Sequence, residues 1–198
     1  MRSALVVVGV VLLIIGLAFF SGIGSYNGMV TADEAVTRSW ADVETQYQRR
    51  ADLIPNLVNT VRGASDFEQE TLTAVTEARA RATSVNLSPG DLSDPAKMES
   101  FMAAQESLSG ALGRLLVVSE NYPQLRATEA FRDLQVQLEG TENRINVARR
   151  DYNDQVAVYN GKVRQFPGSI IASITGFDRK TPFEAQKGAE DAPTVDFN

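Results

Sequence analysis

Polar side chains that could form a functional site are concentrated in two stretches of the chain. The first stretch contributes two cations, a carboxylate and an amide: Arg49, Arg50, Asp52 and Asn56. The second stretch follows much later and contributes Glu142, Asn143, Arg144, Arg149 and Asn153. Arginine forms two-pronged hydrogen bonds with carboxylates, so these groups could pair with one another or bind a partner.

The residue inventory restricts the chemistry that these groups can do. The chain has 198 residues with no cysteine and no histidine. The absence of cysteine excludes disulfides, thiolate nucleophiles and cysteine-ligated zinc. The absence of histidine removes the commonest general base and metal ligand. We therefore predict a non-enzymatic protein with no catalytic residue, no cofactor and no metal site.

The charge balance also bears on the choice of partner. The chain carries 19 basic and 25 acidic residues, which gives a formal net charge of −6. Nucleic acids attract basic surfaces because their phosphates are negative. We therefore expect no nucleic-acid partner.

The element that must position the first polar stretch is a long helix over residues 25–62. Large apolar residues recur there at seven-residue intervals in two interleaved series, which include Met29, Val36, Val43 and Leu57 in one and Trp40, Tyr47, Ile54 and Val61 in the other. A strand would need a period of two instead. Pro55 lies inside this pattern, but the phase is kept across it, which favours a kinked continuation over a break.

The second polar stretch lies in a helix over residues 128–166. Six large apolar residues are spaced by seven along it: Phe131, Leu138, Ile145, Tyr152, Tyr159 and Phe166. A second set flanks that seam: Leu134, Thr141, Ala148, Val156 and Val163. Pro167 and Gly168 end the pattern. This spacing favours two long helices that pack with nearly parallel axes.

Two shorter helices are predicted between the long ones. Residues 65–68 form a capping-box pattern, and the stripe that follows consists of Phe67, Leu72, Val75, Ala78 and Ala82. A turn-rich loop over 86–95 ends at Asp94 and Pro95, an N-cap followed by a proline at the first helical position. The next helix stops near residue 121. Its Gly110 and Gly113 lack the context of a phosphate-binding loop, so we attribute them to tight helix packing.

These elements predict an all-α fold. Short connections favour antiparallel neighbours, so we expect an up-down-up-down four-helix bundle over residues 25–166 with long first and last helices. Arg50 occupies a seam position of the first helix, and an Arg there needs a carboxylate partner because an unpaired buried charge is costly.

Antiparallel pairing of the two long helices would bring the polar stretches together. We therefore predict one polar network formed by nine residues: Arg49, Arg50, Asp52, Asn56, Glu142, Asn143, Arg144, Arg149 and Asn153. The favoured role of such a network is to fix helix register and order. A binding site for a partner or an ion is the alternative, and catalysis is the least favoured interpretation.

The N-terminal residues predict a membrane location. Ala4 to Gly24 contains no charged residue and spans roughly 30 Å as a helix, the thickness of the hydrocarbon core of a bilayer. We predict a transmembrane anchor over residues 1–24, with a cleaved signal peptide as the alternative. Arg2 precedes the run and the first cation after it is Arg38, so we expect a cytoplasmic N-terminus and an extracytoplasmic bundle.

The C-terminal region, residues 167–198, is predicted to lie outside the bundle. Residues 169–177 are apolar but too few to span a bilayer. They could lie on the membrane, pack under the bundle, or dock on a neighbouring copy. From Asp178 onward the tail is polar and acidic, which is typical of an extended or disordered segment.

Several motifs resemble those of the LemA family of bacterial membrane proteins. They are the runs at residues 48–58 (QRRADLIPNLV), 77–80 (EARA), 108–115 (LSGALGRL), 120–125 (ENYPQL) and 138–145 (LEGTENRI), with Ala148-Arg149 and Tyr152-Asn153 after the last. The resemblance extends from Tyr26 to Phe197. It implies a membrane anchor and a helical bundle, a loose link to the cell envelope, and a related group in magnetosome membranes. It implies no catalytic residues.

These observations favour a single-pass protein of the bacterial plasma membrane. We expect an envelope scaffold or interaction module held in the lipid bilayer by Ala4–Gly24, which self-associates and contacts other envelope proteins. An adaptor or sensor is the alternative. It would have to act with another membrane protein, because so few residues precede the apolar run. An enzyme is disfavoured by the residue inventory.

Overall fold

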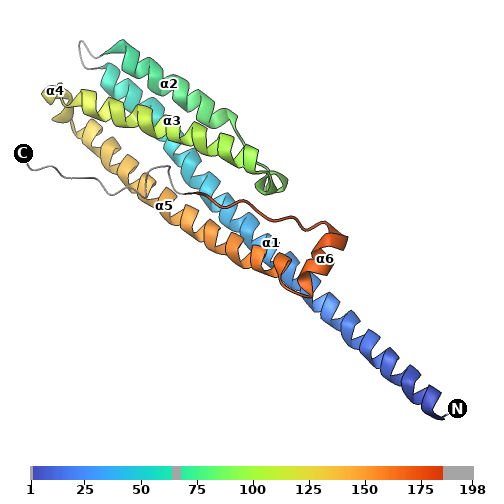
Figure 1. Ribbon diagram of the computed structural model, residues 1–198. Coiled ribbons are helices and arrows are strands. Elements are labelled where there is room, and N and C mark those ends of the chain that lie inside the picture. The colour runs from blue at the N-terminus through green and yellow to red at the C-terminus, as the bar shows by residue number, and fades with distance from the viewer. Residues whose placement is uncertain (1, 64–67, 185–198) are drawn as a thin grey trace, which may run out of the picture.

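The computed structural model describes residues 2–63 and 68–184 and is helical throughout most of them (Figure 1). Its elements are α1 (Arg2–Arg62), α2 (Gln69–Ser84), the 3₁₀ helix η1 (Pro89–Ser93), α3 (Pro95–Ser119), α4 (Pro123–Arg126), α5 (Glu129–Arg164) and α6 (Gly168–Thr175). No strand occurs in these two ranges. The predictions of an all-α fold and of an N-terminal apolar helix are confirmed.

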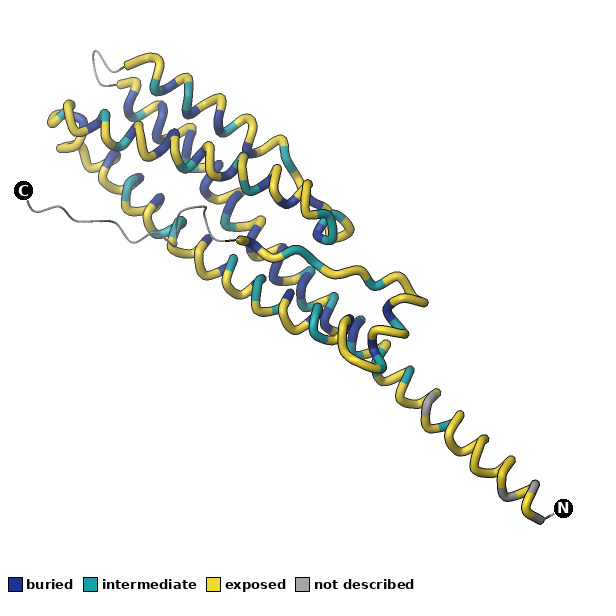
Figure 2. The backbone as a smooth tube through the Cα atoms, in the orientation of Figure 1, coloured by how far each residue is buried: buried dark blue, intermediate teal, exposed yellow. Residues whose placement is uncertain are grey.

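Helix α1 is 61 residues long and has two environments along its length. Its apolar N-terminal part extends beyond the rest of the protein, and none of its most apolar 18-residue window is buried (Figure 2). From Met29 to Val61 the helix is part of the core. The helix continues through Pro55, as predicted, and ends at Arg62.

Helix α5 lies along the core part of α1 and runs antiparallel to it (Figure 1). Thr128 caps its N-terminus by accepting a hydrogen bond from the Phe131 N–H. Its predicted stripe is buried from Phe131 to Val163, because residues spaced by seven share one face of the helix. The prediction for Phe166 is wrong: this residue follows the last turn of α5 and is 80% exposed.

Helices α2 and α3 form a shorter pair that covers the end of the bundle farthest from the N-terminus (Figure 1). The predicted α2 stripe is buried at Leu72, Val75, Ala78 and Ala82. Asp94 caps α3 through the backbone N–H groups of Ala96 and Lys97, as predicted. The capping box was predicted at residues 65–68, of which 65–67, including Phe67 of the predicted stripe, lie outside the described residues; α2 begins at Gln69, with Glu68 at the N-cap position.

The structure differs from a uniform four-helix rod because α2 and α3 are too short to follow α1 and α5 along their whole length. In the part nearer the N-terminus, the space beside the long pair is filled by the α2–α3 connection, by α6 and by the extended segment 177–184 (Figure 1). The short helices α4 and α6 were not predicted. Of the predicted acidic tail, residues 178–184 are extended and docked on the bundle.

Two separate apolar cores result from this arrangement. The distal core lies between α1, α2, α3 and α5 and is mainly aliphatic, with Ile54, Leu57, Leu108 and Leu115 among its buried members. The proximal core lies nearer the N-terminus and contains Trp40, Phe101, Tyr152, Tyr159 and Phe183. We use "distal" and "proximal" in this sense below.

The glycines have different roles from the one predicted. A Cβ at Gly110 or Gly113 would meet no atom within 4 Å, so the interpretation of these two residues as sites of tight packing is wrong. The close approach is at Gly168, where a Cβ would lie 2.3 Å from the Lys162 carbonyl oxygen. Glycine is needed there because the first turn of α6 passes directly over the last turn of α5.

Candidate functional site

Arg50 is the most deeply buried charged residue among those the structure describes, with 1% of its surface exposed. Its Nη1 donates to Glu142 Oε1 on α5 and to Ser109 Oγ on α3, both at 2.8 Å. Its Nη2 donates to the Gln105 side chain at 2.7 Å and to the Gln105 carbonyl at 3.2 Å. One guanidinium group on α1 therefore connects two other helices.

Gln105 extends this connection to the fourth helix. Its amide Nε2 donates to the carbonyl oxygen of Ala82 on α2 at 3.2 Å. Together with the buried Thr141, these groups form a polar layer that we define by Arg50, Gln105, Ser109, Thr141 and Glu142. The layer separates the two cores, since Tyr47 is the last proximal residue on α1 and Ile54 is the first distal one.

The electrostatics of the layer are asymmetric. The Arg50 side chain is fully enclosed, whereas that of Glu142 is 41% exposed. The guanidinium carbon of Arg50 lies 5.1 Å from the centroid of the Tyr47 ring, a cation–π distance. Burial raises the pKa of Tyr47, although the positive charges of Arg149 and Arg50 oppose that rise. The cation thus depends on its partners more than the carboxylate does.

A second buried arginine contact explains how α1 accommodates Pro55. Proline has no N–H, so the carbonyl of Ala51, one turn earlier, loses its helical hydrogen bond. Arg79 on α2 donates from Nε to that carbonyl at 2.8 Å. A buried carbonyl without a partner is costly, and Ala51 is buried. Pro55 and Arg79 therefore form one structural unit that joins α1 to α2.

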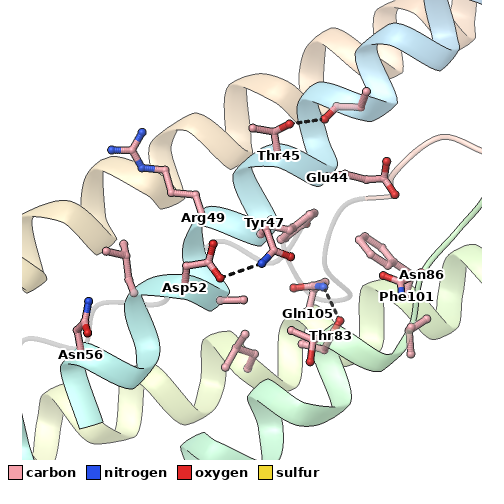
Figure 3. Close-up of a pocket in the computed structure, with 17 residues that line it drawn as sticks. Glu44, Thr45, Tyr47, Arg49, Asp52, Asn56, Thr83, Asn86, Phe101 and Gln105 are labelled. Atoms are coloured by element: carbon pink, nitrogen blue, oxygen red, sulfur yellow. Dashed lines mark hydrogen bonds between the residues drawn. The ribbon is translucent and has the colours of Figure 1, made fainter. Parts of the chain in front are cut away.

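The exposed members of the first polar stretch line an open groove beside this layer (Figure 3). The groove has a volume of about 940 Å³ and is bounded by α1, the end of α2 and α3. Arg49, Asp52 and Asn56 all border it, and Asp52 accepts a hydrogen bond from Gln48 at 2.8 Å. Glu44 borders the same groove. Loss of hydration raises the pKa of its carboxyl group, and this effect outweighs the opposite effect of the Trp40 side chain.

Asn143 and Arg144 lie elsewhere. They border a shallow hollow of about 370 Å³ between α1 and α5, with Asp42, Gln46 and Asp151. Neither residue contributes to the polar layer around Arg50, because both face outward on α5. The position of Asn143 directly after Glu142 therefore does not place the two on the same surface.

Arg149 and Asn153 hold the extended C-terminal segment. Asn153 bonds Phe183 twice: its Nδ2 donates to the Phe183 carbonyl at 2.9 Å, and its Oδ1 accepts from the Phe183 N–H at 2.8 Å. Arg149 donates to the Glu184 carbonyl at 3.3 Å, and its guanidinium lies 4.7 Å from the centre of the Phe183 ring. These two residues therefore bind the protein's own chain.

The same arrangement repeats seven residues later and was not predicted. Asn160 exchanges two hydrogen bonds with the backbone of Lys180, at 2.8 and 2.9 Å. The hydroxyls of the preceding tyrosines donate to tail carbonyls: Tyr152 to Thr181 and Tyr159 to Asp178. The signal for this clamp is present in the sequence as Tyr-Asn at 152–153 and again at 159–160. An amide can donate and accept at once, so it can hold a backbone.

Lys180 completes the clamp. Its Nζ lies 3.2 Å from Asp33 Oδ1 on α1 and donates to the Pro89 carbonyl of η1 at 3.3 Å. The Thr181 N–H donates to the Leu92 carbonyl at 2.8 Å. The tail segment is thus bonded to α1, η1 and α5 at once.

The nine residues of the predicted network are therefore divided among four places: the polar layer, the open groove, the shallow hollow and the tail clamp. Only Arg50 and Glu142 contact each other. Within residues 2–63 and 68–184, no group of three acidic side chains is placed to hold a metal ion. The Ser109 hydroxyl accepts from Arg50 and donates to the Gln105 carbonyl, both structural bonds.

This combination of features defines a class: an all-helical protein whose core helix continues into an exposed apolar segment long enough to cross a bilayer. A model of the LemA family matches residues 39–197 of the chain. The chain belongs to the LemA family, which confirms the resemblance drawn from its motifs.

The curated relatives include two kinds of protein. Magnetosome protein MamQ 2 of Paramagnetospirillum magneticum is 27% identical over 186 residues, which covers 86% of this chain and 68% of the relative. Magnetosome protein MamQ of Magnetospirillum gryphiswaldense is 26% identical over the same length. Protein LemA of Metamycoplasma hominis is 23% identical over 176 residues, covering 89% of this chain and 76% of the relative.

Proposed function

We propose that this protein is a non-enzymatic, single-pass scaffold of the bacterial plasma membrane that holds a helical interaction module at a set distance from the bilayer. The observation that carries the proposal is the continuity of α1, which is both the exposed apolar segment and the core of the bundle. A bundle joined to its anchor by an unbroken helix cannot bend or turn independently of that anchor, so the helix sets its distance from the bilayer.

The proposed orientation has the N-terminus in the cytoplasm and the bundle outside. It is supported by Arg2 ahead of the apolar run and by the absence of cations between that run and Arg38. The chain has no cysteine, so single-cysteine variants are free of background labelling. Glu139 on α5 is exposed and Ser3 lies before the apolar run. A cysteine at each position would therefore report one side of the membrane.

The test is labelling of membrane-intact cells with an impermeant maleimide. We expect Glu139→Cys to react in intact cells and Ser3→Cys to react only after the membrane is opened. The reverse pattern would overturn the orientation. Release of the full-length chain from membranes by alkaline carbonate would overturn the anchor itself, since a spanning helix resists that treatment.

We further propose that the anchored bundles self-associate. Rods fixed to one surface are already aligned and locally concentrated, so weak lateral contacts suffice. The test is co-expression of two differently tagged full-length copies, followed by detergent solubilisation and affinity capture. We expect one tagged copy to retain the other. Self-association would be contradicted if the affinity resin retained only the tagged copy that it binds and if cross-linking in membranes gave only monomers.

An adaptor is the second candidate, and the open groove favours it. The groove presents Arg49, Asp52 and Asn56 on α1 beside apolar Phe101 and Leu108, a mixture that suits a partner's helix or loop. A photo-cross-linking amino acid at Asp52 should capture a second protein in stoichiometric yield if the adaptor role holds. The same group at exposed Glu139 is the control. Equal capture at both positions would count against the groove.

We assign the polar layer a structural role in this function. The bonds from the two terminal nitrogens of Arg50 to α3 and α5 form only when these helices are aligned in one register. A slipped register would leave the guanidinium buried without its carboxylate, which is costly. The layer would thereby keep the distal and proximal faces of the scaffold in a constant relation.

A further inference from the structure

Helix α6 carries a patch of large apolar side chains that the bundle leaves uncovered. Ile170 is 51% exposed and Ile174 is 75% exposed, and their four-residue spacing places both on one face of α6. Phe166, which is 80% exposed, lies two residues before the helix begins. The opposite face is buried at Gly168 and Ala172. The other exposed large apolar residues of α3 and α5 are isolated valines: Val117, Val136, Val147 and Val158. The α6 patch, defined as Phe166, Ile170 and Ile174, is therefore exceptional outside the N-terminal segment.

The position of α6 relates this patch to the apolar N-terminal run. Ile171 lies beside α1, and its Cδ1 is 3.5 Å from where a Cβ at Gly22 would be. The ring of Phe177, just after α6, packs edge-on against Tyr26 at 5.7 Å. Since Gly22 is two residues from the end of the run at Gly24, this contact lies within about 3 Å of the end of that run.

The direction of α6 also suits a membrane surface. The helix lies across the direction of α1 and α5, not along it (Figure 1). If α1 crosses the bilayer, a helix set across it at the level of Gly22 lies along the plane of the interface. Amphipathic helices bind in this plane with their apolar face at the boundary between headgroups and acyl chains.

The charges around the patch fit a phospholipid surface. No charged residue occurs between Arg164 and Asp178, so no ionic group would have to be moved into the acyl boundary. Three basic residues, Lys162, Arg164 and Arg179, flank this uncharged stretch together with one acidic residue, Asp178, and all four are exposed. Basic side chains at such flanks can reach the phosphates of lipid headgroups while their stems cover apolar surface.

We propose that α6 is an interfacial helix that inserts Phe166, Ile170 and Ile174 into the leaflet through which α1 leaves the bilayer. The proposal rests on the membrane anchoring proposed above and goes beyond it, because it gives the protein a second lipid contact. A second contact restrains the tilt of the rod relative to the bilayer, which one spanning helix leaves free. Since residues 177–184 follow α6 directly, this contact is also mechanically linked to the proximal core.

The test uses full-length protein in phosphatidylcholine vesicles, with an environment-sensitive nitrobenzoxadiazole dye on a single introduced cysteine. Ile174→Cys reports the α6 patch, Leu12→Cys reports the spanning segment, and Val136→Cys on distal α5 is the aqueous control. Lipids brominated in the acyl chain quench dyes that reach the hydrocarbon. We expect quenching at residue 174 to exceed that at residue 136 at least twofold, with the strongest quenching at residue 12.

The outcomes separate the two proposals. Quenching at residue 12 with none at residue 174 beyond the control would overturn the interfacial helix and leave the anchor standing. A blue-shifted but unquenched dye at residue 174 would also overturn it, because the patch would then be covered by a second copy. No quenching at residue 12 would overturn the anchor and the inference together. If the Ile174→Cys variant fails to fold by circular dichroism, Ile170→Cys supplies the same measurement.

Discussion

The distal and proximal halves of the bundle bury their apolar surface in different ways. In the distal half, four helices surround a core of leucine, valine and isoleucine. In the proximal half, only α1 and α5 are long helices, and an aromatic core around Trp40 is closed by η1, α6 and the segment 177–184. The distal core is therefore enclosed by packed helices. The proximal core is enclosed partly by large aromatic side chains and by a segment that is held through backbone hydrogen bonds.

The two halves bury their apolar surface differently because they bring together different parts of the chain. The distal half adds α2 and α3 to the long pair, and these two helices follow α1 directly in the sequence through short links. The proximal half joins Trp40 on α1 to Phe183 in the C-terminal segment, far apart in the chain. The polar layer around Arg50 lies between the two halves. It therefore interrupts the apolar packing at the boundary between the four-helix distal half and the proximal half.

The largest effect should come from Trp40, whose ring contacts Phe101, Tyr152 and Phe183 at centroid distances of 5.3–5.9 Å. We expect Trp40→Ala to lower the free energy of unfolding by about 3–5 kcal/mol. Hydrogen exchange should then accelerate at the amides of Thr181 and Phe183. Leu115→Ala in the distal core is the control and should leave these two amides protected. Equal loss of amide protection at these two residues in both variants would mean that the two cores unfold together.

The next largest effect should come from the polar layer, and it should be asymmetric. Glu142→Ala leaves the enclosed Arg50 cation without its carboxylate, so we expect a loss of about 2–3 kcal/mol. Arg50→Leu leaves a carboxylate that water can reach, so stability should change by less than about 1 kcal/mol. Urea denaturation measures both. A larger loss for Arg50→Leu than for Glu142→Ala would contradict the assignment of the cation as the dependent partner.

The register role of the layer needs a separate measurement. Spin labels at exposed Asn59 on α1 and Glu139 on α5 report the alignment of the two helices. The distribution of distances between them should broaden in Arg50→Leu, even where stability is unchanged. An unchanged distribution would indicate that apolar packing alone sets the register.

Glycine substitutions should have opposite signs in the two halves. Gly168→Ala places a Cβ against the Lys162 carbonyl oxygen, and we expect the proximal half to lose about 1–3 kcal/mol. Gly113→Ala on α3 meets open space and should raise stability by about 0.5–1 kcal/mol through helix propensity. Thermal unfolding of the two variants checks both signs. Stabilisation by Gly168→Ala would show that α6 can move away from α5 without cost.

Arg79 and Pro55 should be coupled, which tests how α2 is joined to α1. Arg79→Met should cost about 1–2 kcal/mol because the Ala51 carbonyl loses its donor. Pro55→Ala restores a helical N–H for that carbonyl, so the cost of Arg79→Met in that background should fall by about 1 kcal/mol. A double-mutant cycle in urea measures the coupling. Strict additivity would mean that the two residues act independently.

The tyrosines of the tail clamp should have the smallest effect on stability at neutral pH. Their effect should grow in alkaline solution. Burial, helped by the charges of Asp33 and Asp178, raises the pKa of Tyr159 from 10.0 to about 12. Burial also raises the pKa of Tyr152. Ionisation is therefore easier when the tail is undocked. The stabilisation from these groups is complete below pH 10 and is lost as the pH rises through 12.

Ultraviolet absorbance of tyrosinate, followed together with exchange of the Lys180 amide, checks this window. Tyr159→Phe removes one of the two groups and should reduce the pH dependence while keeping the ring in the core. Loss of tail protection already at pH 8 would show that the clamp depends on other groups. Retention of full protection above pH 12 would show that tyrosine ionisation does not oppose docking.

Much of the helical framework could be predicted because its causes are local. The seven-residue spacing of Phe131 to Tyr159 specifies which face of α5 is buried, and Thr128 and Asp94 mark helix starts through their own side-chain bonds. The seam position of Arg50 predicts a buried cation that needs a carboxylate. The same periodicity misplaced Phe166, because a pattern cannot show that the helix ends two residues earlier.

The sequence by itself determined the four longer helices, most of the buried face of each, and the apolar N-terminal segment, since these depend on residues within a few turns of one another. Only the tertiary structure decided which carboxylate meets Arg50, that Arg79 serves the carbonyl freed by Pro55, and that the tail docks on the Tyr-Asn repeat. The contacts of Arg79 and of the tail join distant residues through backbone groups that every residue carries, and the Arg50–Glu142 pair is one of many arginine–carboxylate pairs that the sequence allows. Helix periodicity does not specify which of these distant groups meet, so the packing of the helices selects them.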